Sequence, residues 1–92
     1  MKLHILYHAA NEEVYGLGLI EELGRHGYQL SPGTLYPTLA KMQQTGLLTS
    51  TTRTVNHKQR KYYNITPSGL KQLNRLKIKI KELYKEVYLE RP

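Results

Sequence analysis

The spacing of apolar positions predicts two short helices in the first third of the chain. The first follows the three- and four-residue steps of an amphipathic helix, with an apolar face of Leu3, Leu6, Tyr7 and Ala10. Asn11 to Glu13 then predicts a helix end and a turn. The second helix is predicted to run from about Tyr15 or Gly16 to about Arg25 and to bury Leu17, Ile20 and Leu23, with Gly24 and Gly27 around its exit.

A third helix is marked at both ends between Ser31 and Gly46. Ser31 is suited to the N-cap, where its hydroxyl can accept a hydrogen bond from a first-turn amide, and Pro32 is suited to the first helical position. Gly46 is suited to the left-handed residue that follows the last turn. The predicted apolar face consists of Leu35, Leu39 and Met42, and the opposite, outer face of Gly33, Thr34, Pro37, Ala40, Lys41 and Gln44, flanked by Tyr36, Thr38 and Gln43.

The outer face of this third helix offers hydroxyls, an amide and one cation, and it carries no acid. Such a surface can approach a polyanion closely. Pro37 breaks the local rules, because proline past the first turn removes a backbone hydrogen bond and crowds a carbonyl. Two explanations stay open: a distorted first turn that begins at the flexible Gly33, or a flat, rigid ring required on the exposed face.

A β-hairpin is predicted directly after the third helix. The segments Leu47–Val55 and Gln59–Ile65 are rich in residues that favour strands, and Asn56 to Lys58 forms the predicted turn. Two helices joined by a short turn and followed by a hairpin make a winged helix-turn-helix. The tip region of this wing carries four cations with no acidic neighbour in sequence: Arg53, Lys58, Arg60 and Lys61. Of the adjacent Tyr62 and Tyr63, one should face the core and the other solvent.

A long last helix is predicted from Pro67 to about Leu89, because Thr66 and Pro67 repeat the start signal of the third helix. Its apolar positions alternate three and four apart, as in a coiled coil, at Leu73, Leu76, Ile80, Leu83 and Val87, and are widened by Leu70, Ile78 and Tyr84. The same helix of a second chain is the best candidate to cover this stripe. The predicted division is therefore a winged helix over 1–66 and a dimerisation helix over 67–92.

The net charge of +7 is unevenly distributed. Residues 1–30 are acidic on balance, residues 31–66 contain five cations and no acid, and residues 67–92 are again basic. A basic balance fits DNA, RNA or an anionic membrane surface. On the last helix, the interspersed Glu residues and the regular apolar stripe favour dimerisation over membrane binding.

Length and residue types exclude several classes of protein. Ninety-two residues allow one domain, and the absence of Cys excludes disulfides and thiolate metal sites. No apolar run approaches membrane-spanning length, and the N-terminus lacks a secretion signal, so a cytoplasmic protein is expected. His4 and His8 stand one helical turn apart, but two ligands make no metal site unless His26 and His57 converge with them. Without Cys, Asp or a Gly-rich phosphate loop, neither an enzyme nor a bound cofactor or metal is expected.

Several separated motifs occur in an order that resembles the PadR family of bacterial transcription regulators. They are SPGTLYP at 31–37, Leu39, Met42, Gly46-Leu47-Leu48, the run Arg60-Lys61-Tyr62-Tyr63-Asn64-Ile65-Thr66, and the upstream step Tyr15-Gly16. The resemblance covers nearly the whole chain. It implies that the protein represses transcription and that a small aromatic compound could release it from DNA. The absence of Trp and Phe leaves only tyrosines as walls for such an effector.

The predicted fold is mainly α with a small β-hairpin, a winged helix-turn-helix plus a C-terminal dimerisation helix. The predicted function is sequence-specific binding of double-stranded DNA as a homodimer. Lys41, the wing cations and the amides near Tyr15-Gly16 would hold phosphates, and base edges would meet Thr34, Tyr36, Pro37, Thr38 and Gln44. Two alternatives stay open: a protein-interaction module whose third helix docks on a partner, and an RNA or membrane-surface binder.

Overall fold

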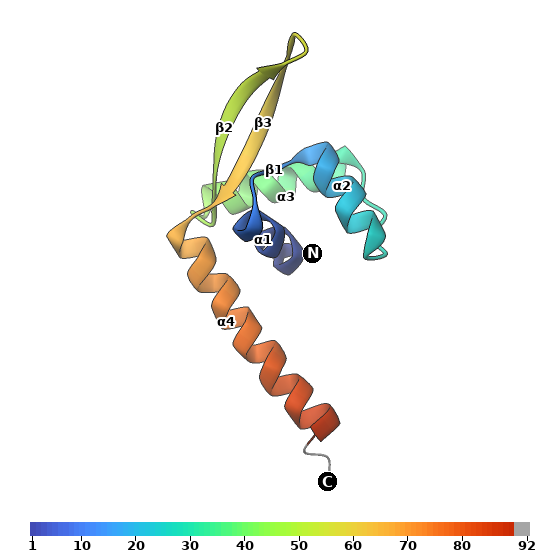
Figure 1. Ribbon diagram of the computed structural model, residues 1–92, viewed down its shortest axis with the longest axis vertical. Coiled ribbons are helices and arrows are strands. Elements are labelled where there is room, and N and C mark those ends of the chain that lie inside the picture. The colour runs from blue at the N-terminus through green and yellow to red at the C-terminus, as the bar shows by residue number, and fades with distance from the viewer. Residues whose placement is uncertain (90–92) are drawn as a thin grey trace.

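The computed structural model describes residues 1–89, which form four helices and a small antiparallel sheet whose hairpin projects beyond the helices (Figure 1). The helices are α1 (Lys2–Asn11), α2 (Gly16–Arg25), α3 (Pro32–Gln44) and α4 (Pro67–Tyr84), and α4 continues as a π-helical turn over Lys85–Leu89. The strands are β1 (Val14–Tyr15), β2 (Leu48–Val55) and β3 (Lys58–Ile65), in the order β1-β3-β2. This is the predicted winged helix with a long last helix. The predicted dimerisation segment covers 67–92, and its last three residues lie outside the described residues.

The buried faces of the first two helices differ from the predicted ones. Helix α1 buries Ile5, Leu6 and Ala9, while Tyr7 and Ala10 are exposed. Helix α2 buries Gly16, Leu19 and Leu23, and Leu17 is 58% exposed. Both helices are short and apolar on more than one side, so periodicity alone allows neighbouring choices of face. Packing against the sheet, α3 and α4 selects between them.

Helix α3 matches its predicted bounds and its predicted core face. Leu35, Leu39 and Met42 are buried, and Gly46 has a φ of 82°, the left-handed conformation expected after the last turn. Ser31 is the N-cap, but its hydroxyl accepts no amide hydrogen bond, which corrects that part of the prediction. The hydroxyl lies 3.4 Å from Oγ1 of Thr34 instead. The helix continues through Pro37.

The sheet contains the predicted hairpin and one strand that was not predicted. Asn56 and His57 form the turn, both with positive φ (51° and 66°), while Lys58 already belongs to β3 rather than to the turn. Strand β1 pairs with the other edge of β3, in the register Val14 to Tyr63 and Tyr15 to Tyr62. Tyr63 is 4% exposed and joins the core, as one of the two adjacent tyrosines was expected to do.

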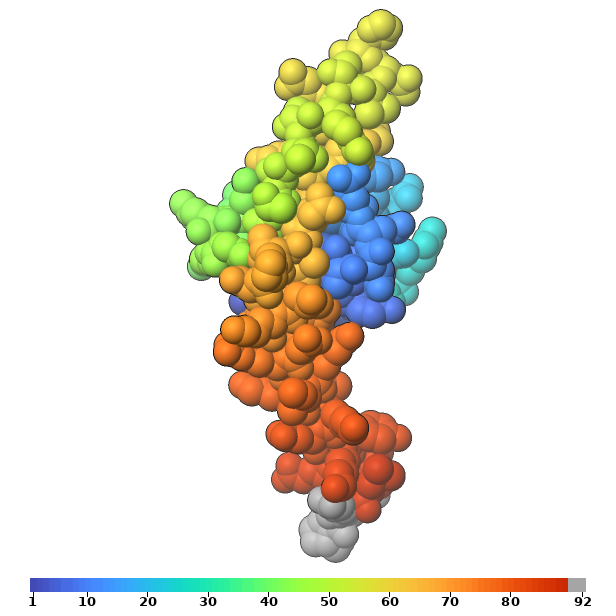
Figure 2. Space-filling model, turned by 60° about the vertical axis from the view of Figure 1, so that its left-hand side comes forward, coloured from blue at the N-terminus to red at the C-terminus, as the bar shows by residue number. Residues whose placement is uncertain are grey.

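Helix α4 begins against the body formed by α1, α2 and α3, which is called the head below, and then projects away from it. The Thr66 hydroxyl oxygen accepts a hydrogen bond from the Gly69 amide at 2.9 Å, which confirms the predicted cap. Leu73 is 1% exposed and belongs to the core, so it is not available to a second chain, contrary to prediction; Leu76 packs partly against the same core. Farther along, Ile80, Leu83, Tyr84 and Val87 are each 46–60% exposed. Figure 2 shows α4 and the hairpin projecting from opposite ends of the head.

The start of α4 is packed so closely that only glycine fits at position 69. A Cβ there would lie 2.1 Å from the Leu47 carbonyl oxygen and 2.7 Å from Cγ1 of Ile65. We expect Gly69→Ala to lower the free energy of unfolding by about 1–3 kcal/mol, because backbone must move to relieve the overlap. Gly24→Ala is the control, since a Cβ at Gly24 meets nothing within 4 Å. It should raise that free energy by about 0.5–1 kcal/mol. Urea unfolding measures both, and equal changes would contradict the packing argument.

Candidate nucleic-acid interface

The outer face of α3 is open to solvent over its whole length. Gly33, Thr34, Pro37, Ala40, Lys41 and Gln44 are all exposed, and Tyr36 is 44% exposed. The Thr38 hydroxyl donates to the Thr34 carbonyl oxygen at 3.1 Å, which turns its hydrogen inward and leaves its oxygen as an acceptor. The acid-free face predicted from the sequence is thus presented by a rigid helix and not covered by another part of the described chain.

A contact between glycine and tyrosine sets the start of α2 against α3. A Cβ on Gly16 would lie 2.5 Å from both Cε1 and the hydroxyl oxygen of Tyr36. The absence of a side chain at Gly16 therefore lets the Tyr36 ring lie directly over the first turn of α2. This arrangement brings the Tyr15-Gly16 step, where backbone amides at a helix start have no helical acceptor, beside the exposed face of α3.

A groove of about 540 Å³ separates this helix pair from the wing. One wall is formed by Tyr15, Gly16, Leu17 and Tyr36, and the other by the hairpin residues Val55, Asn56, Lys58, Gln59, Arg60 and Lys61. Residues that were predicted from three separate motifs thus border a single groove. Leu17, Asn56 and Gln59 were not predicted to take part, because nothing local in the sequence shows that they face it.

Arg53 differs from the other wing cations because it is paired within the chain. Its guanidinium donates to a carboxylate oxygen of Glu13 and lies 3.8 Å from the centroid of the Tyr62 ring. Desolvation works against its charge, but the hydrogen bonds to Glu13 and Tyr62 outweigh it and raise the pKa of Arg53 above its ordinary value. The wing cations have no acidic neighbour in sequence, but the fold brings Glu13 against one of them.

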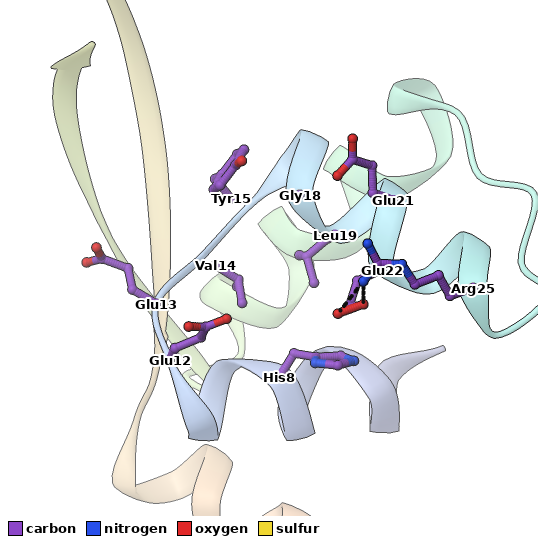
Figure 3. Close-up of a pocket in the computed structure, with 10 residues that line it drawn as sticks. All are labelled: His8, Glu12, Glu13, Val14, Tyr15, Gly18, Leu19, Glu21, Glu22 and Arg25. Carbon is purple, nitrogen blue, oxygen red and sulfur yellow. Dashed lines mark hydrogen bonds and ion pairs between the residues drawn. The ribbon is translucent and has the colours of Figure 1, made fainter.

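A second hollow, of about 200 Å³, lies between α1 and α2 and has the opposite charge (Figure 3). Its lining includes Glu12, Glu13, Glu21 and Glu22, and Arg25 pairs with Glu22 at 2.9 Å. All four acids of the first thirty residues border this hollow, although the Glu13 carboxylate pairs with Arg53 of the hairpin. The groove beside the wing, whose lining contains Lys58, Arg60 and Lys61, is left basic.

Three histidines meet where α1 passes the end of α2. The His4 and His26 rings are stacked with centroids 4.8 Å apart, and the His8 centroid lies 6.0 Å from that of His26. Nδ1 of His4 and Nε2 of His8 are buried without a hydrogen-bond partner. His57 is at the wing tip and takes no part. Within residues 1–89, no group of three or more His, Cys, Asp or Glu side chains is placed to hold a metal ion.

Comparison with known proteins identifies the family. The model of the transcriptional regulator PadR-like family matches residues 5–75 of the chain. The protein is a member of the PadR family. Transcriptional regulator Rv3488 of Mycobacterium tuberculosis is 48% identical over 87 residues, which is 95% of this chain and 81% of that protein. Members of this family are regulators of transcription.

Solved structures agree with this assignment. A PadR-like transcriptional regulator from Bacillus cereus has a TM-score of 0.81 at 37% identity, over 91% of this chain and 84% of that one. A PadR family transcriptional regulator from Eggerthella lenta has a TM-score of 0.80 at 32% identity, over 89% and 72%. None of the helices in the described part of this PadR protein is long and apolar enough to cross a membrane.

The histidine cluster predicts how the stability of this PadR protein depends on pH. Burial lowers the pKa of His4 below its ordinary 6.5, and His26, the N-terminus and His8 lower it further. The unfolded chain then binds a proton more readily than the folded one. The free energy of unfolding should therefore be highest above pH 6.5, fall as pH drops through the interval between the two pKa values, and level off below it.

Replacing His4 should reduce this dependence of the unfolding free energy on pH. We expect His4→Gln to flatten the fall in unfolding free energy between pH 7.5 and 5, measured by urea denaturation. His57→Gln at the wing tip is the matched control and should keep the full fall. Equal pH profiles for the two variants would show that the acid sensitivity arises elsewhere.

Proposed function

We propose that this protein binds double-stranded DNA sequence-specifically as a homodimer and represses transcription. The observation that carries the proposal is the single groove bordered by the exposed α3, the start of α2 and the basic wing. A helix with an acid-free outer face fits the major groove, and a basic hairpin beside it can reach the adjacent phosphates or minor groove.

The proposed interface residues divide into those that position the protein on the DNA backbone and those that recognise the base sequence. The proposed phosphate contacts are Lys41, Lys58, Arg60, Lys61, the backbone amides at Tyr15-Gly16, and Ser31 at the start of α3. Thr34, Tyr36, Pro37, Thr38 and Gln44 are proposed to meet base edges and thymine methyl groups. Arg53 is left out of the phosphate set, because Glu13 and Tyr62 already engage it.

Dimerisation is proposed through the part of α4 that leaves the head. Ile80, Leu83, Tyr84 and Val87 are exposed, and the neighbouring Leu76 is only partly covered. An apolar stripe on a projecting helix is a surface that soluble monomers avoid, and pairing with a second copy would cover both stripes. Two-fold pairing would place two α3 helices on half-sites about one turn of DNA apart.

The family resemblance supports repression as the proposed mode of regulation. A dimer bound to a promoter through this interface would exclude other proteins from the same DNA.

A small aromatic effector would find tyrosines as its aromatic contacts near the end of the last helix. The rings of Tyr84 and Tyr88 have centroids 5.1 Å apart.

The wing predicts a salt dependence that tests DNA binding directly. We expect the double variant Arg60→Ala, Lys61→Ala to weaken binding to every duplex and to flatten the slope of log affinity against log salt by about 0.9 for each lost contact. Fluorescence anisotropy at several salt concentrations, with RNA and anionic vesicles as competitors, measures both effects. An unchanged slope would remove the wing from the interface.

A substitution on α3 supplies the contrast for this test. Thr34→Ala removes no charge and should cost about 1–3 kcal/mol on the preferred duplex if the hydroxyl reads a base directly. Binding to a random duplex should keep its affinity and its salt slope. Equal losses on both duplexes would show that Thr34 only positions the protein.

The proposed dimerisation predicts that changes to the exposed stripe of α4 halve the sedimenting mass of the protein. We expect wild-type protein to sediment as a dimer at micromolar concentration and the double variant Ile80→Asp, Leu83→Asp to sediment as a folded monomer, because the paired stripe would bury unpaired charge. The variant should also lose tight operator binding while every proposed DNA contact remains. Both positions lie beyond the core, so circular dichroism should show an intact head.

The matched control is Asn74→Asp, which adds an acid at an exposed polar position of the same helix. This variant should remain dimeric. A folded wild-type monomer at micromolar concentration would contradict the proposed role of α4.

A further inference from the structure

Glu13 connects the turn before β1 to both strands of the hairpin. One carboxylate oxygen accepts a hydrogen bond from Nη2 of Arg53 on β2, and the other accepts one from Nδ2 of Asn64 on β3 at 3.3 Å. Figure 3 shows Glu13 pointing toward the hairpin strands, while its neighbour Glu12 points the opposite way, toward the hollow between α1 and α2. One side chain thus links the two long strands, through Arg53 on β2 and Asn64 on β3.

The strand register creates a conflict between charges on this face. Arg53 and Arg60 lie directly opposite each other on β2 and β3, where like charges repel. The structure separates them with aromatic rings: Arg53 lies on Tyr62 at 3.8 Å, and Arg60 lies on Tyr15 at 4.4 Å. The two rings contact each other edge to face, with centroids 5.7 Å apart. Glu13 pairs with only one of the two arginines.

The two arginines therefore differ in what they can offer to DNA. Arg60 borders the groove beside α3, whereas Arg53 does not line it. The Arg53 side chain is half exposed and the Glu13 side chain about one third exposed, so the pair lies at the surface and a competing phosphate could reach it. Without Glu13, the Arg53 guanidinium would be free to pair with the DNA backbone.

We propose that Glu13 is a positioning residue that holds Arg53 away from DNA phosphates and thereby lowers binding to non-specific DNA. The proposal rests on the proposed DNA-binding function. A phosphate contact carries no sequence information, so a surplus cation strengthens binding to every duplex. On the preferred site, base contacts by α3 would fix the register, and Arg53, which does not line the groove, would stay out of reach of the phosphates. On random DNA no register is fixed, and a released Arg53 would find a phosphate.

The variant Glu13→Gln tests this role with little change in shape. We expect affinity for a random duplex to rise about eightfold at about 0.1 M salt, and the salt slope on that duplex to steepen by about 0.9, which corresponds to one added phosphate contact. Affinity for a duplex selected by the wild-type protein should change less than about twofold. The ratio of specific to random affinity should therefore fall about eightfold.

Two further variants separate this role from a general effect of charge. Glu12→Gln removes the same charge from the adjacent residue, which points away from the hairpin, and should leave the random-duplex slope at the wild-type value. Adding Arg53→Gln to Glu13→Gln should return the slope and the random-duplex affinity to wild-type values. A slope change of equal size for Glu12→Gln and Glu13→Gln would overturn the proposal.

The remaining outcomes distinguish this proposal from the function on which it rests. If Glu13→Gln weakens both duplexes with an unchanged salt slope, Glu13 is only a structural brace and the positioning role is wrong. If wild-type binding to duplexes is salt-dependent and the variant behaves like wild type, the proposal fails while the proposed function stands. If the wild-type protein binds no duplex, both fail.

Discussion

The relative placement of the helices and the wing depends on three hydrogen bonds made by Thr66. The Thr66 amide donates to the Leu47 carbonyl at 3.1 Å, its hydroxyl donates to the Gly46 carbonyl at 2.5 Å, and the same hydroxyl oxygen accepts from Gly69 at 2.9 Å. These bonds join the end of α3, the base of the hairpin and the first turn of α4. Because Gly69 has no side chain, α4 can start directly against the Leu47 carbonyl. The junction thereby sets the angle between the exposed helix, the wing and the projecting helix together.

Charge is separated across this framework in a way that suits a polyanionic partner. The acids of α2 and of the turn between α1 and β1 line the hollow of Figure 3, and Lys58, Arg60 and Lys61 of the hairpin border the other groove. At the wing this separation is broken by the pair of Glu13 with Arg53. Under the proposed function, an acid at that place would remove a phosphate contact that any duplex could use. Discrimination between sequences would then be left to α3, whose outer face carries few charges.

Helix α4 serves two purposes along its length. Its first turns, with Gly69 and Leu73 buried and Leu76 partly so, complete the core of the winged helix. Its later turns leave the head (Figure 1), and their apolar stripe is exposed to solvent. A small head has too little surface to cover a helix of this length, so a partner for the outer part is the physical expectation. The proposed pairing surface is therefore part of the same helix that completes the core beside the proposed DNA-binding surface.

The sequence by itself determined the elements whose signals are local. The Ser31 to Gly46 boundaries, the core face of α3, the hairpin and the Thr66 cap each depend on residues within a few positions of one another, and all were confirmed. Tertiary structure alone decided the buried faces of α1 and α2, the two-residue strand β1, the placement of Leu73 in the core and the pairing of Arg53 with Glu13 forty positions away. Short helices with several apolar sides leave the face undetermined, and neither a two-residue strand nor a distant ion pair has a periodicity to detect. Those choices are made by the packing of segments that are far apart in the chain.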